Sequence, residues 1–154
     1  MHKDLIIEVI INSLAKPMQI GFYKRGKLVK QEEYDGLTSD ILLDIVKDIV
    51  DKDSIKRFIY TNGPGSHMAT KITYVILKSL NIIKGIDIAS VSAFELNDNK
   101  PIKALGKLYF VKEKETIITK RLEDYKQSSF CMPDSLDNID ILEKSEPDYH
   151  ITAV

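Results

Sequence analysis

The chain has 154 residues, a length that suits one domain with its own hydrophobic core. A net charge of -1 gives no overall sign of nucleic-acid binding, and a single cysteine excludes a disulfide framework within the chain. The first apolar run, residues 5–11, contains a glutamate, is too short to span a bilayer and lacks the layout of a signal peptide. We therefore expect a cytoplasmic protein without a membrane segment.

The charge is unevenly distributed along the chain. Residues 1–122 carry 20 Lys/Arg and 15 Asp/Glu, whereas residues 123–154 carry 2 and 8. This asymmetry predicts a main domain over 1–122 and an acidic C-terminal extension over 123–154. Acidic ends are usually solvated tails, although this one could also dock on a basic partner or on the basic main domain.

Taken in chain order, the first elements are three antiparallel strands. Residues 5–11 are rich in β-branched side chains and predict a buried strand. Met18, Ile20 and Phe22 share one face of a second strand over 18–23. The turn Lys-Arg-Gly-Lys at 24–27 places a glycine where a hairpin needs positive φ, and a third strand follows over 28–34.

Helices and further strands alternate after residue 36. Thr38 or Ser39 is expected to cap a helix that runs to about residue 51. The remaining predicted elements are a strand at 56–61, a helix at 66–81, a strand at 86–91, a short helix at 92–96, a hairpin of 105–111 with 116–119, and a loop with one helical turn at 127–140. This order predicts an α/β fold with a mixed sheet and helices on one or both faces.

Both predicted helices carry more apolar surface than packing against a sheet would bury. Each has an apolar arc of roughly 200°, whereas a helix on a sheet needs only about 100°. The margin of the first helix is acidic and that of the second is basic, so the two either neighbour each other within the monomer or meet across an interface. Both helices could be fully buried, but we expect a partner surface. Its predicted residues are Leu43, Val50, Thr70, Tyr74 and Leu77.

The turn Gly63-Pro64-Gly65-Ser66 joins a strand directly to the second helix. A glycine-rich turn before a helix N-terminus suits a phosphate. The P-loop ending Gly-Lys-Ser/Thr and the pattern G-x-G-x-x-G are both absent. The simpler interpretation is that the glycines form the turn and Ser66 caps the helix.

Other reactive side chains do not combine into a catalytic set. The three histidines are scattered, which argues against a metal site, and Cys131 has no helix start or basic cluster beside it in sequence. Glu8, inside the first strand, could be a catalytic carboxylate in a cleft or a solvent-facing charge.

The series of elements resembles the TsaB (YeaZ) family of the actin/sugar-kinase/Hsp70-like superfamily. Residues 63–66 match the family's G-P-G-S turn, Val91-Ser92 match its later V-S motif, and residues 146–149 (Glu-Pro-Asp-Tyr) look like its closing P-x-Y segment. Asn12-Ser13 stand where superfamily enzymes carry Asp-Thr near phosphate and magnesium. The resemblance implies an RNase H-like sheet with a reduced second lobe, in which Asn12 and residues 63–66 are remnants of a phosphate loop.

The resemblance also implies a role. TsaB-like proteins are non-catalytic subunits of the machinery that makes threonylcarbamoyladenosine (t6A) in tRNA, and they pair through first-lobe helices with the transferase TsaD and with the ATPase TsaE. We therefore expect no intrinsic cofactor, ATP or ADP only near the partner interface, and tRNA contact only through the complex. The alternatives are a small ATPase or phosphotransferase of the same superfamily and a homodimer formed by the same helices.

Overall fold

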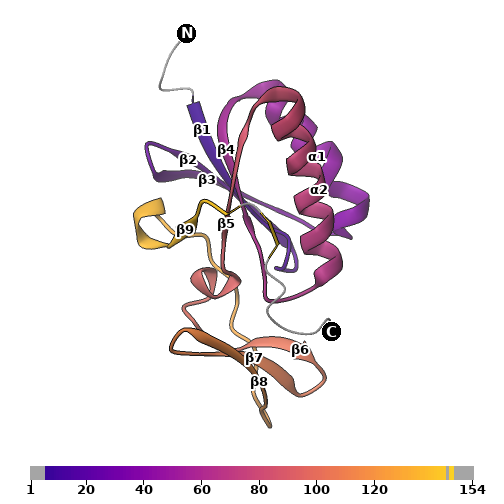
Figure 1. Cartoon of the computed structure of the whole chain (residues 1–154), viewed down its shortest axis with the longest axis vertical. Helices are drawn as coiled ribbons and strands as arrows, with labels where there is room; N and C mark the ends of the chain where they lie inside the picture. The colour runs from indigo at the N-terminus through magenta and orange to yellow at the C-terminus, as the bar shows by residue number, and fades with distance from the viewer. Residues whose placement is uncertain (1–5, 145, 148–154) are drawn as a thin grey trace.

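A six-stranded mixed sheet forms the centre of the computed structural model, which describes residues 6–144, 146 and 147 (Figure 1). Its strands are β1 (Ile6–Asn12), β2 (Met18–Lys24), β3 (Lys27–Tyr34), β4 (Ser54–Thr61), β5 (Asp87–Val91) and β9 (Ile141–Leu142). They lie in the order β3-β2-β1-β4-β5-β9, with β1, β4 and β5 parallel and the other pairings antiparallel. The predicted mixed sheet with three antiparallel strands first is confirmed.

Two long helices cover one face of this sheet. α1 (Thr38–Lys52) and α2 (His67–Lys84) lie next to each other, so the acidic and basic helices are neighbours within the monomer (Figure 1). Alternate residues of β1 and β2 point toward them, as the pattern of residues 18–22 predicted. Buried residues of this layer include Val9, Ile20, Leu42, Val46, Phe58 and Leu77.

The ends of both helices differ from the prediction. Leu37 is the N-cap of α1 and makes no side-chain capping bond, so Thr38 and Ser39 are not its caps. α2 continues past residue 81 to Lys84 and ends at Gly85, whose φ of +70° is left-handed. A glycine in this conformation is a strong helix stop signal, and the predicted end at residue 81 did not take Gly85 into account.

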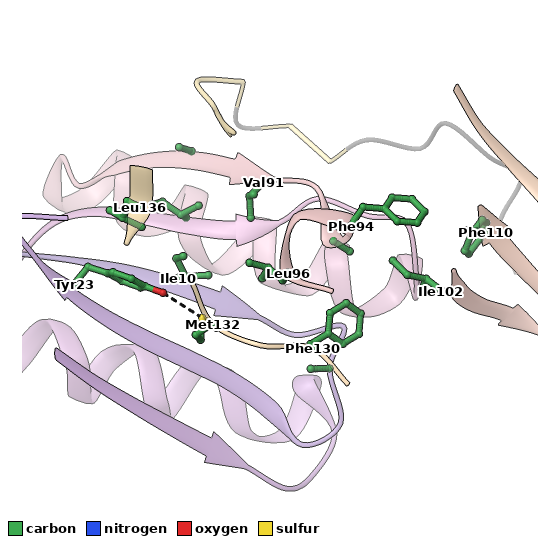
Figure 2. Close-up of a cluster of buried hydrophobic side chains, with 14 residues drawn as sticks. Ile10, Tyr23, Val91, Phe94, Leu96, Ile102, Phe110, Phe130, Met132 and Leu136 are labelled. Carbon is green, nitrogen blue, oxygen red and sulfur yellow. Dashed lines mark hydrogen bonds between the residues drawn. The ribbon is translucent and has the colours of Figure 1, made fainter. Parts of the chain in front are cut away.

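The opposite face of the sheet is covered by a segment from late in the chain instead of by a long helix. Residues 128–136, called the crossing segment below, bring Phe130, Met132 and Leu136 into a core with Ile10 and Val91 (Figure 2). Gly21 in β2 makes room for this passage, because a Cβ there would lie 2.9 Å from Met132 Sδ. The predicted helical turn within 127–140 exists as η3 (Leu136–Asn138), but the segment is a core element and not a surface loop.

Hydrogen bonds fix the crossing segment along β2. Gln19 Nε2 donates to the Phe130 carbonyl at 2.9 Å, and the Tyr23 hydroxyl donates to the Pro133 carbonyl at 2.7 Å. Backbone bonds continue the contact, since Leu28 N donates to Asp134 O at 2.9 Å and Leu136 N donates to Gly26 O at 2.8 Å. These bonds satisfy polar groups that this passage buries.

A separate three-stranded antiparallel sheet lies at one end of the molecule, beyond the short helix η2 (Ala93–Leu96) (Figure 1). It consists of β6 (Ile102–Leu105), β7 (Leu108–Glu113) and β8 (Thr116–Arg121). The sequence predicted only a hairpin here and missed β6, which is four residues long and follows a proline. Ile102 and Phe110 anchor this small sheet to the second core (Figure 2).

The predicted boundary at residue 122 does not coincide with a break in the fold. Beyond residue 122, the crossing segment covers one face of the main sheet and β9 forms one of its edges. Asp148 and Tyr149 of the proposed closing motif lie outside the described residues. Within the described part of the chain, neither helix has the length and apolar character needed to cross a membrane.

We predict that Tyr23→Phe destabilises the protein and changes its alkaline unfolding. The lost hydrogen bond should lower the free energy of unfolding by about 1 kcal/mol at pH 7. Burial, and secondarily the Asp134 carboxylate, raise the pKa of the Tyr23 phenol above its ordinary value of 10.0. The contribution of the Tyr23 phenol to the free energy of unfolding therefore has its full value below pH 10.0. Above pH 10.0 this contribution decreases, by up to about 1.4 kcal/mol per pH unit.

Urea unfolding of both proteins between pH 7 and 11 measures this. The variant should lose less stability above pH 10 than the parent does. An identical alkaline slope in the two proteins would contradict the assignment.

Candidate functional site

The Gly63–Ser66 turn connects the end of β4 to the start of α2 and is held against the end of β5. Asn62 N donates to Val91 O at 3.0 Å, and Ala93 N donates to Gly63 O at 2.8 Å. Gly65 has a φ of +154°, and a Cβ there would lie 3.1 Å from two carbons of Leu14. Both the backbone conformation and the close neighbour therefore require glycine at position 65.

Ser66 caps α2 in the way the simpler interpretation predicted. Its Oγ accepts a hydrogen bond from Ala69 N at 3.2 Å, and its carbonyl accepts one from Thr70 Oγ1 at 2.9 Å. The start of a helix this long has a partial positive charge, which suits an anion. The turn is thus both a helix start and a surface that a phosphate could approach.

Asn12 lies beneath the turn and organises the corner between β1 and β2. Its Oδ1 accepts hydrogen bonds from Thr61 Oγ1 at 3.2 Å and from Leu14 N at 3.1 Å. The Oγ of the adjacent Ser13 lies 2.9 Å from Thr73 Oγ1 of α2, within hydrogen-bond distance. The structure thus brings Asn12 close to the Gly-Pro-Gly-Ser turn through Leu14, which Asn12 binds and Gly65 contacts.

A cleft of about 640 Å³ opens in front of this corner, between the β1–β2 loop, the turn and β6. Its polar lining includes Lys16, Gln19, Glu33, Ser66, Lys103 and Gln127. Gln19 is buried, and its Oε1 has no hydrogen-bond partner within the described residues. Two lysines and a helix start favour an anionic ligand in this cleft. Sequence reasoning missed Lys16 and Lys103, because these lysines are more than 80 residues apart and belong to no motif.

Glu8 is not part of this cleft. It accepts hydrogen bonds from Arg57, with Nη2 at 2.6 Å and Nε at 2.9 Å, in the half of β1 away from Asn12. Arg57 Nη1 also lies 3.7 Å from Glu143. Glu8 lines a separate cleft of about 440 Å³ together with Arg57 and Glu143, so a catalytic role for this carboxylate would have to be exercised apart from the turn. Cys131 is exposed on the crossing segment.

The predicted partner residues divide into three groups. Leu43 on α1 is exposed, with 53% of its surface accessible, while Val50 and Tyr74 are half-buried. Thr70 and Leu77 are buried beneath α2, at 1% and 0% exposure. These two residues contact the body of the protein and cannot lie at the centre of a partner surface without a rearrangement of α2.

The outward face of α2 is instead formed by other apolar residues. The exposed fractions are 68% for Met68, 53% for Val75, 73% for Ile82 and 75% for Ile83. The helix is turned so that Thr70, Thr73 and Leu77 face the sheet. The sequence predicts Thr70 and Leu77 on the partner side, because helical periodicity cannot tell which edge of a broad apolar arc faces the core. The two buried threonines were the signal that the helix is turned the other way.

Comparison with known proteins identifies the fold but no sequence relative. No protein-family model and no curated protein matches the chain. It is similar in structure to YeaZ from Pseudomonas aeruginosa, with a TM-score of 0.55 and 12% identity over 74% of this chain and 64% of that one. It is also similar to an uncharacterized protein with similarity to the peptidase YEAZ from the same organism, with a TM-score of 0.56 and 12% identity over 82% and 64%.

At this identity the likeness concerns the fold, and there it confirms the predicted resemblance to YeaZ and the RNase H-like class. The chain covers 64% of the length of each of these structures. We therefore treat the activity, partners and ligands of the longer proteins only as proposals for this chain.

We predict that Gly65→Ala destabilises the protein more than Gly106→Ala does. Both glycines have positive φ, but an added Cβ at Gly106 meets nothing within 4 Å, whereas at Gly65 it meets Leu14. The expected loss is about 1 kcal/mol at Gly106 and about 2–4 kcal/mol at Gly65. Urea denaturation measures both, and equal losses would contradict the close contact between the turn and Leu14.

Proposed function

We propose that this chain is a non-catalytic subunit that binds a TsaD-type transferase through the outer face of its helices, in the t6A modification of tRNA. A TsaE-type ATPase is the second proposed partner. The observation that carries the proposal is the exposed apolar face of α2. The likeness in fold to YeaZ supports the choice of partner.

The outward residues of α2, of which Ile72 is half-buried and the others are exposed, form a regular seam. Met68, Ile72, Val75, Ser79 and Ile82 follow one another at intervals of four, three, four and three residues. This is the spacing by which one helix packs along another, with Ser79 as the single polar member. Seam residues that face solvent in a monomer are the usual mark of a protein interface.

The flanks of this seam add to its fit for a partner. Lys71 and Lys78 lie on one side of α2, and Leu43 adds an exposed apolar side chain from α1. Full burial of one leucine, isoleucine, valine or methionine contributes about 1.5–3 kcal/mol. Covering Met68, Val75 and Ile82 would therefore supply a substantial part of a stable association.

The side-chain contacts of Asn12 and Glu8, in the two halves of β1, support a role without phosphotransfer. Asn12, in the place of the superfamily aspartate, uses its Oδ1 to hold Thr61 and the Leu14 backbone. Glu8 is engaged by Arg57 at the other half of the strand. We therefore favour a subunit over the alternative of a small ATPase. ATP or ADP near the joint with the partner stays a proposal, and the cleft beside Ser66 is where its phosphates would fit.

Self-association is the second candidate, and one observation favours it. Met68 and Ile82 lie seven residues on either side of Val75, so a two-fold axis at Val75 would place each against the other's copy. A homodimer of this kind would use the transferase surface. Sedimentation should then show that the homodimer dissociates as transferase is added. If one assembly contains both the homodimer and bound transferase, the two interactions do not share a surface.

We predict that Val75→Glu weakens binding to the cognate TsaD-type transferase by at least about 2 kcal/mol, roughly thirtyfold in Kd. The reason is that an interface would bury an unpaired carboxylate. Val29→Glu is the matched control, because Val29 on β3 has the same 53% exposure but lies on the edge strand. Isothermal titration calorimetry measures both variants.

If the Val75→Glu variant binds the transferase as tightly as the wild-type chain, α2 is not part of the interface. If the wild-type chain does not bind the transferase at all, the proposed function itself is wrong.

A further inference from the structure

The small sheet and its flanks form a basic part of the chain. Residues 100–126 contain eight Lys/Arg and four Asp/Glu, in a chain whose net charge is -1. Glu123 accepts hydrogen bonds from Lys107 at 2.6 Å and Arg121 at 2.7 Å, and these hold the pKa of its carboxyl below its usual range. Among the described residues, no carboxylate forms an ion pair with Lys103, Lys120 or Lys126.

The two faces of this sheet have different roles. Side chains alternate along a strand, so Ile102 and Phe110, which pack into the second core, define the inner face. The neighbouring row Lys103–Tyr109–Lys120 therefore belongs to the outer face, and its members are paired across the three strands. Lys103 and Lys120 are both exposed and stand two strands apart, roughly 10 Å.

An aromatic pair lies between these lysines. The rings of Tyr109 and Tyr125 meet edge to face with centroids 5.1 Å apart, and the Tyr109 hydroxyl donates to the Tyr125 carbonyl at 3.2 Å. Tyr109 is buried and Tyr125 is half-exposed, so Tyr125 presents the accessible ring. Gln127 Oε1 accepts a hydrogen bond from Lys103 N at 2.7 Å, which holds the stretch with Tyr125 and Lys126 alongside β6.

We propose that this outer face binds a single-stranded segment of nucleic acid. Lys103, Lys120 and Lys126 contact separate phosphates, and an unpaired base stacks on Tyr125. Phosphate contacts by lysine with base stacking on an aromatic side chain are the usual mode of single-strand binding on sheets. An acidic peptide would form ion pairs with the lysines, but its carboxylates would not stack on the ring between them. The proposal goes beyond the transferase surface on α2 and is independent of it.

The test uses the full chain alone and a fluorescein-labelled oligouridine of twelve nucleotides, followed by fluorescence anisotropy between 50 and 200 mM salt. Three phosphate contacts predict a slope of log K against log salt of about -2 for a single strand. The triple variant Lys103→Gln, Lys120→Gln, Lys126→Gln should bind at least tenfold more weakly at 50 mM salt, with a slope near zero. The charge-matched control, Lys47→Gln, Lys56→Gln, Lys84→Gln, changes exposed lysines elsewhere and should retain binding within about threefold.

Stacking is tested separately at Tyr125. Tyr125→Ala should weaken binding at least fivefold without changing the salt slope, because the ring carries no charge. Tyr125→Phe should retain binding, and circular dichroism establishes that each variant is folded. An oligodeoxythymidine of equal length tests whether the 2′-hydroxyl is needed, and binding of either strand supports the site.

Four results would overturn the proposal. These are absence of binding by the wild-type chain at 50 mM salt, an equal loss in the control triple variant, tighter binding of a duplex than of the single strand, and equally effective competition by polyglutamate. Since no transferase is present, none of these results bears on the α2 surface.

Discussion

The narrow contact between α2 and the sheet is the constraint on which the rest of the molecule depends. Thr70, Thr73 and Leu77 are the fully buried residues of α2, and two of the three are small and polar. Their hydroxyls are satisfied locally, since Thr70 Oγ1 donates to Ser66 O at 2.9 Å and Thr73 Oγ1 donates to Ala69 O at 2.8 Å. The helix therefore docks with its polar groups paired, and four of its large apolar residues are left on the outside: Met68, Val75, Ile82 and Ile83.

The turn and the β1–β2 corner fix this orientation. Gly65 lies against Leu14, and Thr73 Oγ1 lies 2.9 Å from Ser13 Oγ, so the first half of α2 is attached at two points to one corner. Features that resemble a phosphate loop thus have a structural role that requires no phosphate. The same attachment explains how a Gly-Pro-Gly-Ser turn serves a partner surface, because it sets the direction of the helix that carries the seam.

The crossing segment solves a different problem, which is how a short chain covers the second face of a central sheet. Neither long helix of the described residues lies there, and Phe130, Met132 and Leu136 fill the space. A passage this close to β2 is possible because Gly21 has no side chain. The acidic end of the chain is therefore part of the core, up to β9, and the small sheet is held at its margin with its basic outer face free.

The sequence predicted the main sheet well because its strands are apolar, short and separated by glycine or charged turns. It also placed Ser66 correctly as a cap, since capping is a local interaction. It could not predict the crossing segment, whose contacts join residues more than 100 positions apart, such as Gln19 and Phe130. It misjudged Leu77 and Thr70 because helical periodicity gives the width of an apolar arc and not its direction.

The most direct test of the central claim is the accessibility of position 75 in the complex. A Val75→Cys variant in a Cys131→Ser background carries one thiol, on the proposed seam, and Val29→Cys in the same background carries one on β3. We predict that saturating TsaD-type transferase slows labelling at position 75 at least tenfold and leaves labelling at position 29 unchanged. If the complex forms and the thiol at position 75 reacts as fast as in the free protein, α2 is not the surface that the partner covers.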